Sequence, residues 1–112
     1  MITLTEQSLK TCDKDSLALS TIEIEKHLRE LNGWTLNYQQ DSQKIIKNYK
    51  FKDFRSAMKF ANMVTDLAEE ENHHPCICIE WGTVNLSWWT HSLSGLFIND
   101  FIMAARCDKA YQ

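Results

Sequence analysis

The chain has 112 residues, 44% of them hydrophobic, and a formal net charge of -3. This length suits one compact domain that buries roughly two thirds of its unfolded surface. The sequence pI of about 5.7, without a long run of Lys and Arg, argues against direct nucleic-acid binding. No stretch approaches the length of a membrane span and no export signal precedes the domain, so we expect a cytoplasmic protein that does not contact membranes.

The cysteines give little support to a disulfide framework. Four are present, at positions 12, 76, 78 and 107, but the core is large for a disulfide scaffold and no signal peptide precedes it. We therefore expect reduced thiols. The first residues are polar and lack periodicity, which predicts a flexible segment over 1–16 followed by a single domain over 17–112.

The first half of the domain predicts a helix and a hairpin. Ser20 and Glu23 have the spacing of a capping box, and the apolar stripe that follows predicts a helix over about 21–31, before Gly33. Two β-rich runs, 34–38 and 45–51, flank a polar stretch. They predict two strands joined by an exposed loop.

The second half repeats this order. Asp53 is placed to cap a second helix that runs to about Glu71, and Pro75 prevents its continuation. Alternating apolar residues then predict strands over 76–81 and 84–89, with Gly82 and Thr83 at the turn. Apolar residues at helical spacing predict a last helix over about 96–109.

The order of elements determines the expected fold class. Helix, two strands, helix, two strands and helix predict a single α+β domain, in which three helices pack on one face of a four-stranded antiparallel sheet. Trp81, Trp88 and Trp89 make the last strand and its partner unusually apolar. Core packing is the commoner explanation for each Trp, but pairing between subunits would also use such a surface.

Three of the four histidines lie in one short segment. His73 and His74 are adjacent, His91 follows at the end of the predicted last strand, and Glu69 lies just before the pair. Histidine titrates near physiological pH, so this cluster is compatible with proton transfer or metal binding. A solvated loop after a helix is the plainer alternative.

Two of the possible chemistries fit the residue pattern poorly. A metal site would use the three histidines with Cys76 or Cys78, but adjacent histidines on an extended chain point apart, and no CxxC or HExxH motif is present. A nucleophilic thiol needs an exposed thiolate, whereas the alternation with Ile77 and Ile79 places both cysteines within a strand, where we interpret them as small buried side chains. General acid and base catalysis without a metal remains, as a possible proton-transfer site.

Longer sequence motifs help to decide between these chemistries. The segment AEEENHHP is followed by Trp81, by WWTH ending at His91, and by Gly95 and Asp100. These motifs, with GW at 33–34 and FKDF at 51–54, resemble the pterin-4a-carbinolamine dehydratase family, especially its bacterial members. The resemblance extends from about residue 17 to 107.

This resemblance implies an activity and a set of residues. The family dehydrates 4a-hydroxytetrahydrobiopterin to quinonoid dihydropterin, a hydro-lyase step in tetrahydrobiopterin recycling for aromatic amino-acid hydroxylases, without a metal or organic cofactor. By similarity, His73, His74 and His91 would be catalytic, and Glu69 would be the active-site acid that contacts substrate. Our hypothesis gives the proton transfers to His73 and His91, the orientation of substrate to His74, and the stabilisation of a neighbouring imidazolium to Glu69.

Two further positions match family motifs. Asp100 and Trp34 would bind substrate, although helix capping for Asp100 and core packing for Trp34 explain them equally well. Cys76 stands where many members carry an acid, which affects only the expected rim of the pocket.

The resemblance also bears on partners. It implies a homo-oligomer, either dimer or tetramer, a pterin substrate, and a place beside phenylalanine hydroxylase in the pathway. Animal members also bind the dimerisation helices of a transcription factor, and some relatives act as assembly factors. A non-catalytic binding, assembly or coactivator module is therefore the alternative function, although such a module has no chemical need for clustered histidines.

Overall fold

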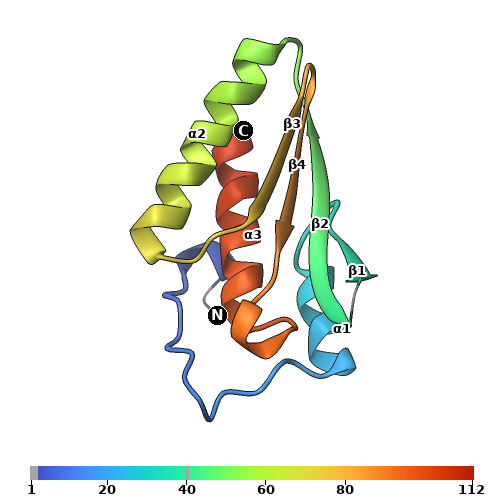
Figure 1. Ribbon diagram of the computed structural model, residues 1–112, viewed down its shortest axis with the longest axis vertical. Coiled ribbons are helices and arrows are strands. Elements are labelled where there is room, and N and C mark those ends of the chain that lie inside the picture. The colour runs from blue at the N-terminus through green and yellow to red at the C-terminus, as the bar shows by residue number, and fades with distance from the viewer. Residues whose placement is uncertain (1–2, 40) are drawn as a thin grey trace.

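The computed structural model describes residues 3–39 and 41–112 (Figure 1). Its elements are η1 (Leu4–Glu6), α1 (Thr21–Arg29), β1 (Thr35–Gln39), β2 (Ser42–Lys50), α2 (Phe54–Glu71), β3 (Cys76–Glu80), β4 (Thr83–Trp88), η2 (His91–Leu93) and α3 (Ile98–Tyr111). The predicted order of three helices and four strands is confirmed. None of the helices in these two ranges is both long and apolar enough to cross a membrane.

The boundaries follow local chemistry. Ser20 and Glu23 form the expected capping box at the start of α1, and the Asp53 carboxylate accepts a hydrogen bond from the Ser56 amide at the start of α2. The first loop is shorter than expected, because Gln39 and Ser42 pair as strand residues; the part of that loop at Gln40 lies outside the described residues. The short helices η1 and η2 were not predicted.

The second half also has boundaries that differ from the prediction. The turn between β3 and β4 consists of Trp81 and Gly82, since Thr83 already pairs with Glu80 across the hairpin. Helix α3 begins at Ile98 rather than at 96, because the Asp100 carboxylate accepts a hydrogen bond from the Phe97 amide and so caps the helix there.

The sheet has the strand order β1-β2-β4-β3, and every neighbouring pair is antiparallel. Each hairpin contributes one central strand, β2 or β4, and one edge strand. In the central pair Ile45 lies opposite Trp88, and in the second hairpin Cys76 lies opposite Ser87. Figure 1 shows the open end of the second hairpin, where β3 begins and β4 ends, near the end of α2 and the start of α3.

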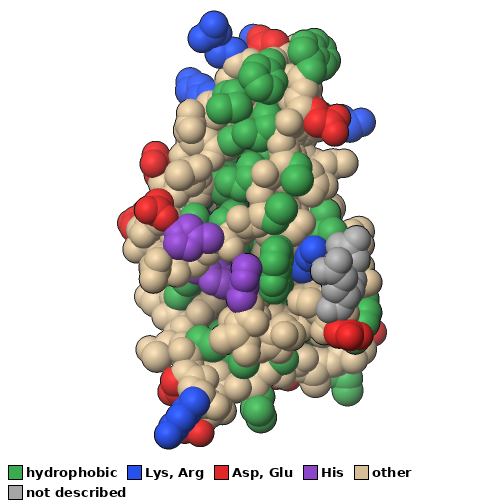
Figure 2. All heavy atoms as spheres, viewed as in Figure 1, with side chains coloured by type: hydrophobic (Ala, Val, Ile, Leu, Met, Phe, Trp, Pro, Cys, Tyr) green, Lys and Arg blue, Asp and Glu red, His purple; other side chains and the backbone are tan. Residues whose placement is uncertain are grey.

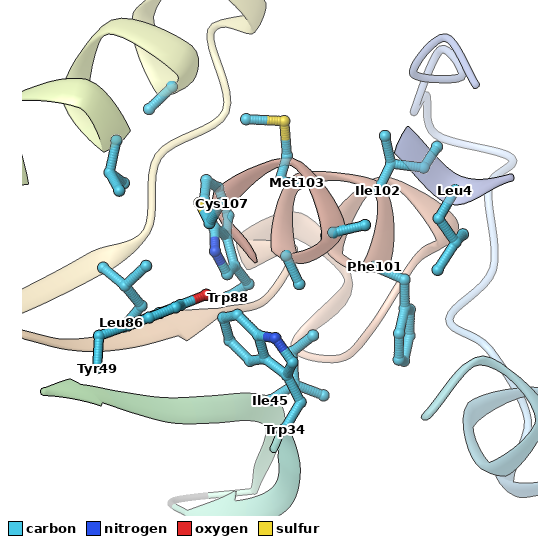
Figure 3. Packing of buried hydrophobic residues seen from close by; sticks show 14 of the residues in the cluster. Leu4, Trp34, Ile45, Tyr49, Leu86, Trp88, Phe101, Ile102, Met103 and Cys107 are labelled. Carbon is cyan, nitrogen blue, oxygen red and sulfur yellow. The ribbon is translucent and has the colours of Figure 1, made fainter. Parts of the chain in front are cut away.

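The core lies between one face of this sheet and the helices. Side chains of alternate strand residues point from β2 and β4 toward α3 (Figure 3). The largest fully buried side chains include Trp88, Tyr49, Phe101, Ile24, Ile45, Leu86, Leu96, Ile102 and Met103. Because the helices gather on this face, none of the helices in the described residues covers the opposite face of the sheet.

The prediction that the two cysteines of β3 are buried is wrong, because both lie on this uncovered face. Cys76 and Cys78 are exposed rather than buried. The intervening Ile77 and Ile79 pack against the core, so strand alternation directs both cysteines to the opposite side. Trp81 is likewise 71% exposed at the turn, whereas Trp88 is completely buried.

Part of the N-terminal segment packs on α3. Leu4 is buried, and the Asn99 side chain exchanges two hydrogen bonds of 2.7 Å with the backbone of Lys10. Arg106 donates a hydrogen bond to the Gln7 carbonyl at 2.8 Å and forms an ion pair with Glu71. The segment before residue 17 thus has defined contacts, and its flexibility stays a prediction.

Candidate active site

The end of α2 separates the two adjacent histidines. Asn72 adopts the left-handed conformation at φ 51°, and the amide of His73 donates to the Ala68 carbonyl at 3.1 Å. This closes the helix and reverses the chain within two residues. His73 and His74 therefore leave the helix end in different directions and find different partners.

His73 points inward. Its Nε2–H donates to Oδ1 of Asp100 at 2.6 Å, and its ring stacks on the buried indole of Trp88 with 5.4 Å between centroids. Only 18% of the His73 side chain is exposed, and that of Asp100 is fully buried. The other carboxylate oxygen, Oδ2, accepts from the Thr90 hydroxyl at 2.8 Å and from the Phe97 amide at 3.0 Å. Every part of the buried carboxylate thus has a donor, as burial of a charge requires.

His74 points outward. Its Nε2–H donates to the carboxylate of Glu69, one turn back on α2, and both side chains are more than half exposed. Three acids at the end of α2 oppose the helix dipole, and the structure shows what compensates two of them. Glu69 pairs with His74, and Glu71 pairs with Arg106 at 2.6 Å.

His91 lies where β4 gives way to η2. Its ring is parallel to that of Trp89, with 4.5 Å between centroids and an interplanar angle of 9°. The ammonium group of Lys44 lies 4.8 Å from the centroid of the same indole. Trp89 thus contacts both the imidazole and a cation, and the stacking holds His91 in one orientation just beyond the end of the central strand β4.

These three histidines meet at one pocket of about 360 Å³, lined by Cys12, Asn72, His73, His74, Thr90, His91 and Ser92. Figure 2 shows the histidines grouped on one face, with hydrophobic side chains extending from them over β3 and β4. The prediction had not included Cys12, Asn72, Thr90 or Ser92. Thr90 lies within the WWTH motif, so the sequence motif could have identified it as a pocket residue. Cys12 comes from the distant N-terminal segment, and no sequence motif connects it with the histidines.

The remaining predicted residues have other positions. Asp100 does not line the pocket but lies behind His73, and Glu69 reaches it through His74. Trp34 is buried and does not line this pocket, and its indole N–H donates to the Asp108 carboxylate at 3.0 Å. Within the described residues, no three His, Cys, Asp or Glu side chains are grouped as a metal site.

The pairing of an imidazole with a buried carboxylate, beside two further imidazoles in one pocket, is an arrangement for proton transfer. Comparison with known proteins identifies the family of this chain. The family model for pterin 4 alpha carbinolamine dehydratase matches residues 17–110.

The chain belongs to the pterin-4-alpha-carbinolamine dehydratase family.

Relatives in this family match over nearly the whole chain. A protein of Vibrio vulnificus, provisionally named as a pterin-4-alpha-carbinolamine dehydratase, is 46% identical over 95% of this chain and 96% of its own length. A similarly named protein of Saccharophagus degradans is 42% identical over 100% and 99%. The predicted extent of the resemblance is thereby confirmed.

Solved structures show the same fold. One from Brucella melitensis, described as a transcriptional coactivator/pterin dehydratase, has a TM-score of 0.77 and 29% identity, covering 85% of this chain and 99% of that one. A pterin dehydratase-like protein described as a RuBisCO assembly factor in the alpha-carboxysome has a TM-score of 0.60 and 22% identity, covering 71% and 90%. The second comparison bears on the fold alone.

Proposed function

We propose that this protein catalyses the dehydration of 4a-hydroxytetrahydrobiopterin to quinonoid dihydropterin, in the recycling of tetrahydrobiopterin for an aromatic amino-acid hydroxylase. Membership of the family supplies the substrate class. The observation that carries the proposal is the pair of His73 and buried Asp100 at a pocket shared with His74 and His91.

The reaction needs two proton transfers. Water leaves from the 4a-carbon when its hydroxyl oxygen receives a proton, while a ring nitrogen loses a proton and a carbon–nitrogen double bond forms. One group must donate and a second must accept, and both must contact the same substrate. Two imidazoles in one pocket meet this requirement without a metal ion.

His73 is the group we assign to accept the ring proton. Its hydrogen bond to Asp100 keeps the Nε2 proton in place, so Nδ1 is the nitrogen with a free lone pair. When Nδ1 takes up a proton, the buried carboxylate compensates the new positive charge. Asp100 is then a positioning residue that selects the tautomer and stabilises the imidazolium, as a carboxylate does behind a catalytic histidine.

His91 is assigned as the donor to the leaving hydroxyl. Its stacking on Trp89 fixes the plane of the ring, and its place after β4 brings it to the pocket wall beside Thr90. His74 and Glu69 are assigned to substrate orientation, because their exposed pair borders the same pocket and keeps the His74 ring in one tautomer. After product release His73 returns its proton to solvent and His91 takes one up, which restores both groups for the next turnover.

The test is a stopped-flow assay that generates the 4a-hydroxy compound and follows formation of the dihydropterin. His73→Ala and His91→Ala should each lower the rate by about 100-fold or more, the usual scale for a general acid or base. Circular dichroism should show that both variants fold, since neither side chain is part of the buried core.

The fourth histidine offers a matched control. His27 lies on α1, where its ring packs at a tilt against Phe101 and donates to Glu30, and it does not line the pocket. His27→Ala should keep the wild-type rate. Wild-type rates in His73→Ala or His91→Ala, or an equal loss in His27→Ala, would contradict the assignment.

The structural neighbour described as a transcriptional coactivator/pterin dehydratase supports a second candidate function, a binding module without catalysis. Such a module does not need a buried carboxylate behind an imidazole. A folded wild-type protein that fails to accelerate dehydration in the same assay would favour this candidate. Homo-oligomerisation and a cytoplasmic location stay predictions, the former supported by the exposed Trp81.

A further inference from the structure

The two cysteines of β3 form an exposed thiol pair that the proposed reaction does not use. Their Sγ atoms are 4.0 Å apart, and both side chains are exposed. Residues two apart on a strand are separated by about 6.7 Å along its axis, so the sulfur atoms lean toward each other. We name Cys76 and Cys78 the β3 thiol pair.

The surroundings keep this pair open. Strand β3 is an edge strand, and its single neighbour β4 places the small polar residues Ser87 and Asn85 opposite the cysteines. Ile77 and Ile79 anchor the strand to the core from the other face. The pair thus stands on a rigid, helix-free face with access for a small ligand.

Neither of the other cysteines has this arrangement. Burial raises the pKa of the Cys107 thiol to about 12, which leaves it inert inside the core. Cys12 is half-buried and contacts the Ser92 hydroxyl at 3.8 Å. The two-sulfur geometry is therefore particular to β3 among the four thiols.

We propose that the β3 thiol pair binds one soft metal ion of low coordination number, with Cu(I) as the representative ion. With metal–sulfur bonds of about 2.3 Å, the observed separation of 4.0 Å gives a sulfur–metal–sulfur angle of about 120°. Small rotations of the two exposed side chains widen this angle toward linear.

The ligand set determines the class of metal. Zinc in structural sites takes four ligands, and the part of the chain that the structure describes offers no group of three or more candidate ligands. Thiolates are soft ligands that favour Cu(I), which accepts two of them. Partial burial and the hydrogen bond with Cys78 raise the pKa of the Cys76 thiol, so binding of the ion must displace thiol protons.

An anaerobic competition titration tests the proposal. Reduced full-length protein would be titrated with Cu(I) against a chromogenic Cu(I) chelator. We expect one ion per chain, and a loss of affinity of about 100-fold or more in both Cys76→Ser and Cys78→Ser, because each variant loses the second, intramolecular contact. Both variants should keep the wild-type circular dichroism spectrum.

Cys12→Ser is the matched control, since it removes one half-buried thiol and leaves the pair intact. Its affinity for Cu(I) should equal that of the wild type. Binding that survives in Cys76→Ser or Cys78→Ser, a loss in Cys12→Ser, or one ion shared by two chains would overturn the proposal. The readout is independent of dehydration, so it does not depend on the proposed function.

Discussion

At the scale of single residues, the two adjacent histidines differ in their carboxylate partners. His73 donates to a fully buried aspartate, whereas His74 donates to an exposed glutamate. Water screens the exposed pair, so it contributes little beyond orientation. The Asp100 carboxylate of the buried pair is shielded from water and has a donor at both oxygens, which makes His73 the better placed of the two for a change of charge during catalysis.

Asp100→Asn tests this difference. The amide can still accept from Nε2–H of His73, but it lacks the charge that stabilises the imidazolium and offers an NH₂ group that favours the wrong tautomer. We expect kcat to fall by about 100-fold or more while KM changes little. Steady-state kinetics separate these quantities, and an unchanged kcat in the folded variant would remove Asp100 from the mechanism.

Glu69→Gln is the companion variant. Its side chain is 69% exposed and its partner His74 is assigned to orientation. The change should therefore raise KM more than it lowers kcat. The contrast with Asp100→Asn distinguishes positioning of the catalytic base from positioning of the substrate.

At the scale of elements, helix ends determine where functional side chains emerge. The left-handed Asn72 ends α2 and releases both histidines, and Asp100 caps α3 while it holds His73. The Asp100 carboxylate thus connects the start of α3 to the segment that follows α2. Two factors therefore place the site. The helix caps are local features of the sequence, and the packing of α2 against α3 brings the two caps together.

The capping box of α1 gives a pH prediction. The hydrogen bond from the Ser20 backbone lowers the pKa of Glu23 below its ordinary value of 4.5. A carboxylate with a lowered pKa stabilises the folded state above its unfolded pKa and loses that contribution as the pH falls through the folded pKa. Glu23→Gln should therefore lower the melting temperature at pH 7, and this difference from the wild type should shrink as the pH falls below 4.5.

Glu25→Gln provides the comparison in thermal denaturation. It removes the same charge from the same helix, but Glu25 does not take part in the capping box. Its effect at pH 7 should be smaller than that of Glu23→Gln. Equal effects of the two variants would attribute the result to net charge instead of capping.

At the scale of the whole molecule, one carboxylate connects the sheet to the last helix. Asp108 on α3 accepts from the Trp34 indole at 3.0 Å, from Lys47 at 2.8 Å and from the Tyr49 hydroxyl. These donors come from the start of β1 and from β2. The cluster lies two helical turns from Asp100, so it explains Trp34 as a structural residue of the core and fixes α3 at the end remote from the pocket.

Tyr49→Phe tests this connection. Tyr49 is 1% exposed, and its burial and its bond to Asp108 raise the pKa of the phenol far above its ordinary value, so it acts as a neutral donor. Removing the hydroxyl should lower the free energy of unfolding by about 2 kcal/mol, the scale of a hydrogen bond to a charged group. Urea denaturation measures it, with the 66% exposed Tyr38 as the control for Tyr→Phe. Equal midpoints for the two variants would contradict the structural role.

The amino-acid sequence by itself determined the order of helices and strands, because capping residues and apolar periodicity act over a few neighbours. It also indicated the family and the three histidines that line one pocket, because each lies in a contiguous motif. Sequence patterns could not show that Asp100 lies behind His73 while Glu69 holds His74, since both pairs depend on how α2 meets α3. Nor could alternation alone decide which face of β3 the helices cover. Tertiary packing decided that face, and with it the exposure of Cys76 and Cys78.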